Sequence, residues 1–170
     1  MACALTTGFS LQCRDGAGGI KNVYLIELDN VASYTESSGT ITAITKASGK
    51  VFFKYVLEND TANFAEAITT NRQNGSVYYA QTLQVVLNKL RVAVRNEIKL
   101  LAQNRLVAVV ETMDGSAWLL GKERGMMVSG GSVASGTAMA DRNGYTIDMA
   151  ADEKEPAYEV STGILAGLLT

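Results

Sequence analysis

The residue types that most often carry out catalysis are sparse in this sequence. Its 170 residues include no His and only two Cys, Cys3 and Cys13. Histidine is the commonest general base and metal ligand, and two thiols alone do not complete a tetrahedral zinc site. The start of the chain lacks the basic and apolar regions of a secretory signal, which favours reduced cysteines. We therefore expect no enzyme, cofactor or metal. A disulfide, or a metal shared with carboxylates or another subunit, stays open for the cysteines.

Two glycine-rich stretches match functional motifs only in part. Residues 15–19 (DGAGG) precede a predicted strand instead of linking a strand to a helix, and no Gly-Lys-Ser or Gly-Lys-Thr follows them. Residues 129–136 (SGGSVASG) lack the pattern of a nucleophile elbow, and a Ser–His relay is impossible in a chain without His. Both stretches are predicted to be loops.

Charged residues gather in two clusters. The acidic cluster precedes Pro156 at a spacing that matches no EF-hand loop, so it is a solvated turn, a cation site or a partner for basic groups. The basic cluster flanks a predicted helix, either as a solvated edge or as a contact with an acidic neighbouring subunit. We hypothesise that the two clusters meet between subunits. They consist of Asp152, Glu153 and Glu155, and of Arg91, Arg95 and Lys99.

The composition is that of a folded, nearly neutral protein. Apolar residues make up 47% of the chain and charged residues 19%, which is too apolar for a disordered chain. The net charge of -2 argues against a dedicated duplex DNA or RNA binder, which needs a basic excess. Arg72, Tyr78 and Tyr79 could stack on a single strand, but no basic cluster surrounds them. The length fits one domain, and no apolar stretch is long enough to span a membrane, so we expect no membrane partner.

Short β-type segments separated by glycine dominate the pattern. Asp114-Gly115 indicates a hairpin, Ser48-Gly49 a tight connection and Asn143-Gly144 the last turn. One helix is predicted at 89–102, because Leu87, Leu90, Val94, Ile98 and Leu101 form an apolar stripe that fits the face of a sheet. The predicted strands are 21–28, 40–45, 51–57, 105–111, 117–120, 126–129, 131–138 and 145–150. The expected fold class is mainly β with one flanking α-helix, an antiparallel β-sandwich or barrel.

Residues 63–86 read as a long central hairpin. Asn74-Gly75 indicates a two-residue turn, which would pair Arg72 with Val77 and Phe64 with Val85. Opposed residues share a face, and successive residues alternate between faces. The face predicted to pack on the domain carries Phe64, Ile68, Val77, Leu83 and Val85. The other face is small, polar and uncharged, and carries Ala65, Ala67, Thr69, Asn71, Ser76, Ala80, Thr82 and Gln84.

The length of this hairpin predicts self-assembly. About eleven paired residues span roughly 35 Å, whereas a compact domain of this length has a radius of gyration of about 15 Å. The hairpin must therefore cross the whole domain or project beyond it. Isolated two-stranded ribbons are marginal in water and their open edges invite pairing, so neighbouring subunits are expected to cover them.

The order of elements resembles the tail-tube fold of bacteriophages, shared by tube, terminator and baseplate-ring proteins. It comprises a β-rich start, a long central hairpin, a helix after the second strand of that hairpin, and closing strands. The opening MACALTTGF with residues 13–19 (CRDGAGG) is similar to small structural proteins of Bacteroidetes phages, including crAss-like ones. Residues 143–160 are similar to the closing strand of small virion proteins.

The resemblance implies a structural virion protein that assembles into six-fold rings of a tail tube or a tail-associated ring. The hairpin would join a barrel around a channel for genome passage, with its uncharged face toward the lumen and the helix 89–102 beside the sandwich. It further implies an N-terminal arm at 1–20, a tail tube-like β domain at 21–160 and an apolar C-terminal tail at 161–170. The implied partners are further copies of this chain, other tail proteins such as a tape-measure protein, and DNA that passes through the channel without sequence-specific binding. The implied location is the virion tail, which is assembled in the host cytoplasm. Alternatives are a head–tail adaptor or ring protein of a short-tailed phage, and a soluble β-sandwich binding module.

Overall fold

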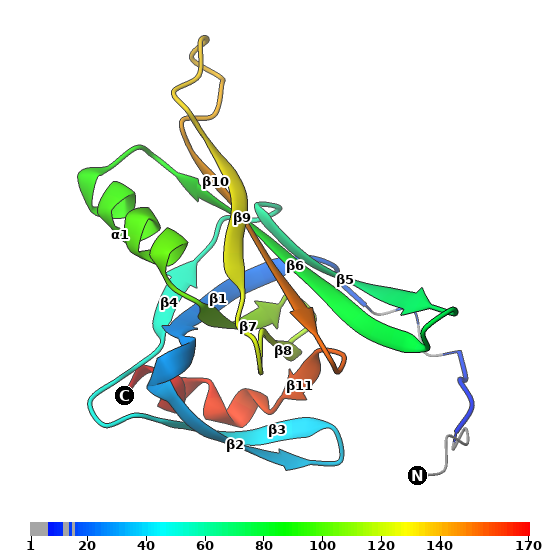
Figure 1. Ribbon diagram of the computed structural model, residues 1–170. Helices are drawn as coiled ribbons and strands as arrows, with labels where there is room; N and C mark the ends of the chain where they lie inside the picture. Colours follow the sequence, from blue (N-terminus) through cyan, green and yellow to red (C-terminus); the bar gives the residue numbers. More distant parts are fainter. Residues whose placement is uncertain (1–6, 12–13, 15) are drawn as a thin grey trace.

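The chain folds into two β-sheets with one α-helix beside them (Figure 1). The structure, a computed structural model, describes residues 7–11, 14 and 16–170. Over these residues there are eleven strands, one α-helix and three short 3-10 helices. The expectation of a mainly β protein is confirmed. Cys3 and Cys13 both lie outside the described residues, so their state stays a prediction.

The larger sheet has the strand order β2-β3-β11-β8-β7-β1-β4. Its pairs are antiparallel except for β3 and β11, which run parallel. The central strands β1 and β7 are covered on both faces, which explains the unbroken apolar run from Leu106 to Val110. The strands are β1 (Ile20–Glu27), β2 (Val31–Ser37), β3 (Thr40–Lys46), β4 (Phe53–Val56), β7 (Leu106–Thr112), β8 (Ala117–Leu120) and β11 (Tyr158–Val160).

The smaller sheet has the order β5-β6-β10-β9 and consists of two long hairpins. Its strands are β5 (Ala62–Asn71), β6 (Ser76–Asn88), β9 (Met127–Ala134) and β10 (Gly144–Glu153). Figure 1 shows that the β5–β6 hairpin, called the ribbon below, extends past the larger sheet on one side, and that the loop between β9 and β10 projects on another. The two strands predicted at 126–129 and 131–138 are one strand. A register shift opposite Asp148 and Met149 bends it.

The apolar core forms two layers on either side of the larger sheet. One layer lies between the sheets, where Leu25 and Val110 pack with Leu83 and Met149. The other lies on the far face of the larger sheet and is closed by the C-terminal 3-10 helices η2 (Thr162–Ile164) and η3 (Ala166–Leu169). Leu168 is buried there, and its carbonyl accepts a hydrogen bond of 2.9 Å from the Phe52 amide. The apolar C-terminal tail is thus part of the packed domain.

The helix α1 (Val92–Gln103) follows β6 as predicted but begins three residues later. Lys89 has a φ of 71°, in the left-handed region, which a right-handed helix excludes. Its amide donates to the Asn143 carbonyl at 2.7 Å, so the chain first contacts the β9–β10 connection. Leu101 is buried against the sheets and Ile98 is half-buried, whereas Leu90 lies before the helix and is exposed.

The glycine turns predicted from the sequence have mixed outcomes. Asp114-Gly115 does join β7 and β8 as a hairpin, with the Asp114 carboxylate accepting from the Ser116 amide at 3.0 Å. Ser48-Gly49 also lies in a tight turn, since the Lys50 amide donates to the Ala47 carbonyl at 3.0 Å. It does not make a hairpin, however. β3 pairs with β2 and β11, while β4 crosses to the opposite end of the sheet and pairs with β1.

Candidate functional site

The ribbon has a wider turn than the sequence predicts. β5 ends at Asn71 opposite Ser76, so the connection comprises the four residues 72–75, and the predicted pairing of Arg72 with Val77 is wrong. Asn side chains build this turn: Asn71 Oδ1 accepts from the Gln73 amide at 2.9 Å, and Asn74 Oδ1 accepts from the Ser76 amide at 3.0 Å. The true register is displaced by two residues, which leaves every side chain on its predicted face.

The small polar face of the ribbon, called the outer face below, points away from the larger sheet. Its predicted members share one side and none is buried. They are Ala65, Ala67, Thr69, Asn71, Ser76, Ala80, Thr82 and Gln84. Tyr78 lies among them and is also exposed. The structure therefore places these residues together at a solvent-facing surface.

Strand β10 extends the outer face and adds negative charge to it. Asp148 pairs with Gln84 in the sheet and Asp152 pairs with Ala80, which puts both carboxylates on the outer side. Gln84 Nε2 donates to Asp148 Oδ1 at 2.7 Å. The sequence of strands β5, β6, β9 and β10 contains no Lys or Arg at all. The outer face of the smaller sheet is thus mostly polar, with Tyr78 and Met127 also exposed on it, and β10 makes it acidic, a property that the hairpin alone did not reveal.

The opposite face of the ribbon is apolar at both ends, with the polar pair Glu66 and Gln81 between them, and only the half near the body is covered. Near the body, Leu83 and Val85 are buried and Phe64 packs against the core. Farther out, Ile68 is 68% exposed and Val77 is 50% exposed. The prediction that Ile68 and Val77 also pack on the domain is wrong within one chain. They lie beyond the point where the ribbon leaves the larger sheet.

A polar anchor holds the ribbon at the place where it leaves the body. Gln81 is buried; its Nε2 donates to Glu66 Oε2 at 2.9 Å and its Oε1 accepts from the Gly121 amide at 2.9 Å. Glu66 Oε2 also accepts from the Ala157 amide at 2.8 Å. These bonds join β5 and β6 to the ends of β8 and β11, so the direction of the ribbon is fixed by buried hydrogen bonds.

The acidic cluster does not form one surface. Glu153 is only 3% exposed, and its carboxylate accepts from the amides of Glu123 and Arg124 at 3.2 and 3.0 Å. Glu155 lies 4.0 Å from the Lys122 ammonium and accepts from the Tyr158 hydroxyl. Asp152 belongs to the outer face. The predicted role of Glu153 as a subunit contact is therefore wrong, because alternation along β10 turns it inward.

The basic cluster is exposed along one side of the helix. Arg91 directly precedes α1, and Arg95 and Lys99 follow on the helix. Arg95 Nη1 donates to Asn96 Oδ1 at 3.2 Å, which is a local contact. The hypothesis that this cluster meets acidic groups of another subunit stays a prediction for Asp152 and Glu155, which are both exposed.

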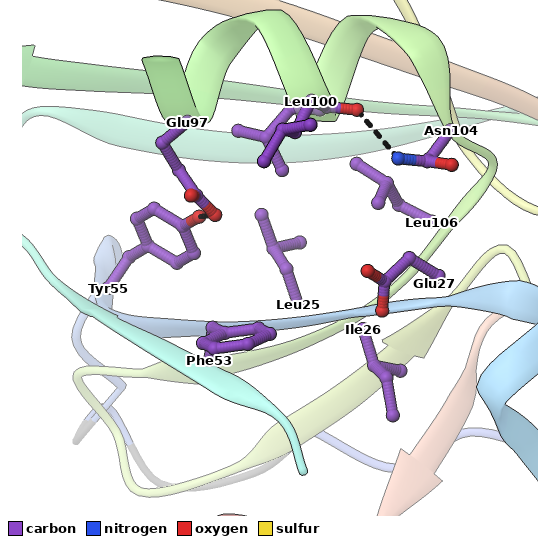
Figure 2. A pocket seen from close by; sticks show the side chains of 10 residues that line it. Leu25, Ile26, Glu27, Phe53, Tyr55, Glu97, Leu100, Asn104 and Leu106 are labelled. Atoms are coloured by element: carbon purple, nitrogen blue, oxygen red, sulfur yellow. Dashed lines mark hydrogen bonds between the residues drawn. The ribbon is translucent and has the colours of Figure 1, made fainter. Parts of the chain in front are cut away.

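A cleft beside α1 was not predicted from the sequence. It has a volume of about 110 Å³ and lies between the helix, β1 and β4. Figure 2 shows Leu25, Phe53 and Leu100 around it, with Glu97 accepting a hydrogen bond of 2.9 Å from the Tyr55 hydroxyl. Burial, and then this bond, raise the pKa of Tyr55 above its ordinary value, so the hydroxyl stays protonated. The sequence predicted the helix and the strand, but not the gap between them.

The two glycine-rich stretches singled out in the sequence do not form catalytic or phosphate-binding motifs among the residues that the structure describes. Residues 129–136 belong to β9 and the loop after it, not to a strand–turn–helix elbow. In the part of the chain that the structure describes, no three His, Cys, Asp or Glu side chains gather as metal ligands. No helix of the described residues is long and apolar enough to cross a membrane. In the other glycine-rich stretch, residues 15–19, Asp15 lies outside the described residues, and residues 16–19 directly precede β1.

No protein-family model, curated protein or solved structure matches the chain.

Proposed function

We propose that the chain is a structural virion protein whose copies close into rings of a bacteriophage tail tube or a tail-associated ring. The smaller sheet would line a channel for genome passage. The observation that carries this proposal is the apolar half-ribbon around Ile68 and Val77, which has no partner within the described part of its own chain. Exposed apolar residues on a projecting ribbon are stabilised when a neighbouring copy covers them.

The two edge strands of the smaller sheet support the proposal of a ring. β5 and β9 are its outermost strands, and among the described residues neither pairs on its outer side. If β5 of one copy pairs with β9 of the next, the contact is heterologous and closes by rotation. Six copies would then form a barrel of about 24 strands at about 4.8 Å each, which is about 37 Å across at the backbone. Such a channel is wider than a DNA duplex.

The outer face has the surface chemistry that such a channel needs. Lys and Arg would bind phosphate through counterion release, and these four strands contain neither residue. Asp148 and Asp152 would repel the DNA backbone. Large apolar patches would hold a tape-measure protein, whereas the outer face consists mostly of Ala, Ser, Thr, Asn and Gln.

A binding module is the second candidate, because a groove of about 600 Å³ runs beside α1 and β4. A ring-forming adaptor of a short-tailed phage would use the same sheet edges as a tail ring. The module differs from both in needing no self-assembly.

Electron microscopy of the negatively stained, purified protein tests the proposal. At high concentration and moderate salt we expect rings or stacked rings with a central channel. Particles of single-chain size under all these conditions would overturn the proposal and favour the binding module.

A further inference from the structure

The N-terminal arm presents two large apolar side chains to solvent. Phe9 is 90% exposed and Leu11 is 88% exposed, and residues 7–11 belong to no helix or strand. The two residues are separated by one position. In a β-strand, such residues point to the same side of the sheet. If the arm became a strand, both side chains would enter the same surface.

The groove beside α1 is a surface of matching character. Its inner cleft, about 110 Å³, and its outer part, about 600 Å³, share Phe53, Tyr55 and Glu97 in their walls. Phe53 and Leu100 are each 53% exposed, and Figure 2 shows them on the two sides of the inner cleft. The described part of the arm carries one charged residue, Arg14. The inner cleft carries the carboxylates of Glu27 and Glu97, which are opposite in charge to Arg14, whereas the walls of the outer part also carry Glu58 and the basic residues Lys54, Lys89 and Arg91.

The groove lies next to an open sheet edge. β4 is the last strand of the larger sheet, and over the described residues its outer side pairs with no strand. A strand added to such an edge gains main-chain hydrogen bonds, and every second side chain enters the pockets beside it. β4 has four residues and the arm segment has five, so their lengths match.

We propose that residues 7–11 of one copy add as a strand to β4 of a second copy, with Phe9 and Leu11 in the groove between β4 and α1. Figure 1 shows the dark-blue segment on the side of the ribbon, whereas α1 and β4 lie on the opposite side of the molecule. The arm thus leads away from the groove of its own chain. This contact is independent of the ring contacts proposed above, because it uses the edge of the larger sheet.

Photo-crosslinking with isotope labelling tests this exchange. Full-length chain carrying Phe9→benzoylphenylalanine is mixed with an excess of ¹⁵N-labelled chain, irradiated and digested for mass spectrometry. We expect crosslinks to heavy peptides that contain residues 53–57 or 94–101. Ser10→benzoylphenylalanine is the matched control. Its side chain would point away from the groove, and its yield there should be at least about tenfold lower.

Crosslinks confined to light peptides would show that the arm binds its own chain, and would overturn the proposal. The proposal would also be overturned by equal crosslink yields from positions 9 and 10, by crosslinks to other elements of the heavy chain, or by the absence of any crosslink. A double substitution, Phe9→Ser with Leu11→Ser, should weaken binding between copies at the β4 edge at least about tenfold and leave thermal unfolding unchanged. The ring proposal is separable, because Ile68→Thr with Val77→Thr should abolish rings but retain the position-9 crosslinks.

Discussion

Replacing Ile68 and Val77 together by Thr should prevent assembly without unfolding the chain. Thr keeps the β-branched shape that suits a strand and removes apolar surface that a neighbour would bury. Fully burying an Ile or Val side chain contributes about 1.5–3 kcal/mol. Since 68% and 50% of these residues remain exposed in one chain, the interface would gain about 2–3 kcal/mol from the pair. Each contact between copies should therefore weaken about 30- to 150-fold.

Sedimentation velocity over a range of concentrations measures the assembly, and urea unfolding measures the stability of the chain. The free energy of unfolding should change by no more than about 0.5 kcal/mol, because both positions face solvent. Leu83→Ala is the matched control on the same face. Leu83 is 1% exposed, and its truncation should cost about 2–5 kcal/mol of folding stability.

Two results would refute this reasoning. If the double variant assembled at the same concentrations as the native chain, the apolar half-ribbon would not be an interface. If the double variant lost as much stability as Leu83→Ala, these residues would pack within their own chain.

Three further predictions address the outer face, the anchor and the acid limit of stability. Thr69→Lys with Thr82→Lys should leave rings intact and slow genome ejection from virions, because Lys in the channel binds phosphate; normal ejection kinetics would place this face elsewhere. Gln81→Leu should lower the free energy of unfolding in urea by about 1–3 kcal/mol, because the Glu66 carboxylate and the Gly121 amide lose their partner; an unchanged midpoint would show that the anchor is dispensable. Partial burial raises the pKa of Glu111, but hydrogen bonds from Asn22, Lys21 and Tyr24 outweigh it and hold that pKa below its ordinary value. Its contribution is thus present above pH about 4.5 and lost as the pH falls through the lower, folded pKa, so Glu111→Gln should flatten the acid limb of a stability–pH curve; an equally steep limb would contradict this assignment.

The ribbon shows what a local signal can and cannot determine. Asn74-Gly75 correctly marks where the chain reverses, but the side chain of Asn71 recruits a wider turn and moves the register by two residues. Because that displacement is even, both faces were predicted correctly. The exposure of Ile68 and Val77 could not be predicted, since it depends on where the larger sheet ends.

Other differences arise from contacts distant in the sequence. β2 was not predicted, because most of its residues are exposed and polar and its pairing with β3 supplies the order. The helix begins late because Lys89 bonds to Asn143. Asp152, Glu153 and Glu155 looked like one cluster in the sequence, but alternation along β10 and a turn before β11 send them to three different environments. The cleft beside α1 depends on β4 crossing to β1, which no local pattern indicates.

Native mass spectrometry of the purified chain shows whether its copies close into a ring, because a closed ring has a fixed number of copies. We expect one dominant assembly at six times the 18.1 kDa mass of the chain, and we expect the Ile68→Thr, Val77→Thr variant to lose it. A single-chain mass at every concentration, or a ladder of sizes with no closed species, would contradict it.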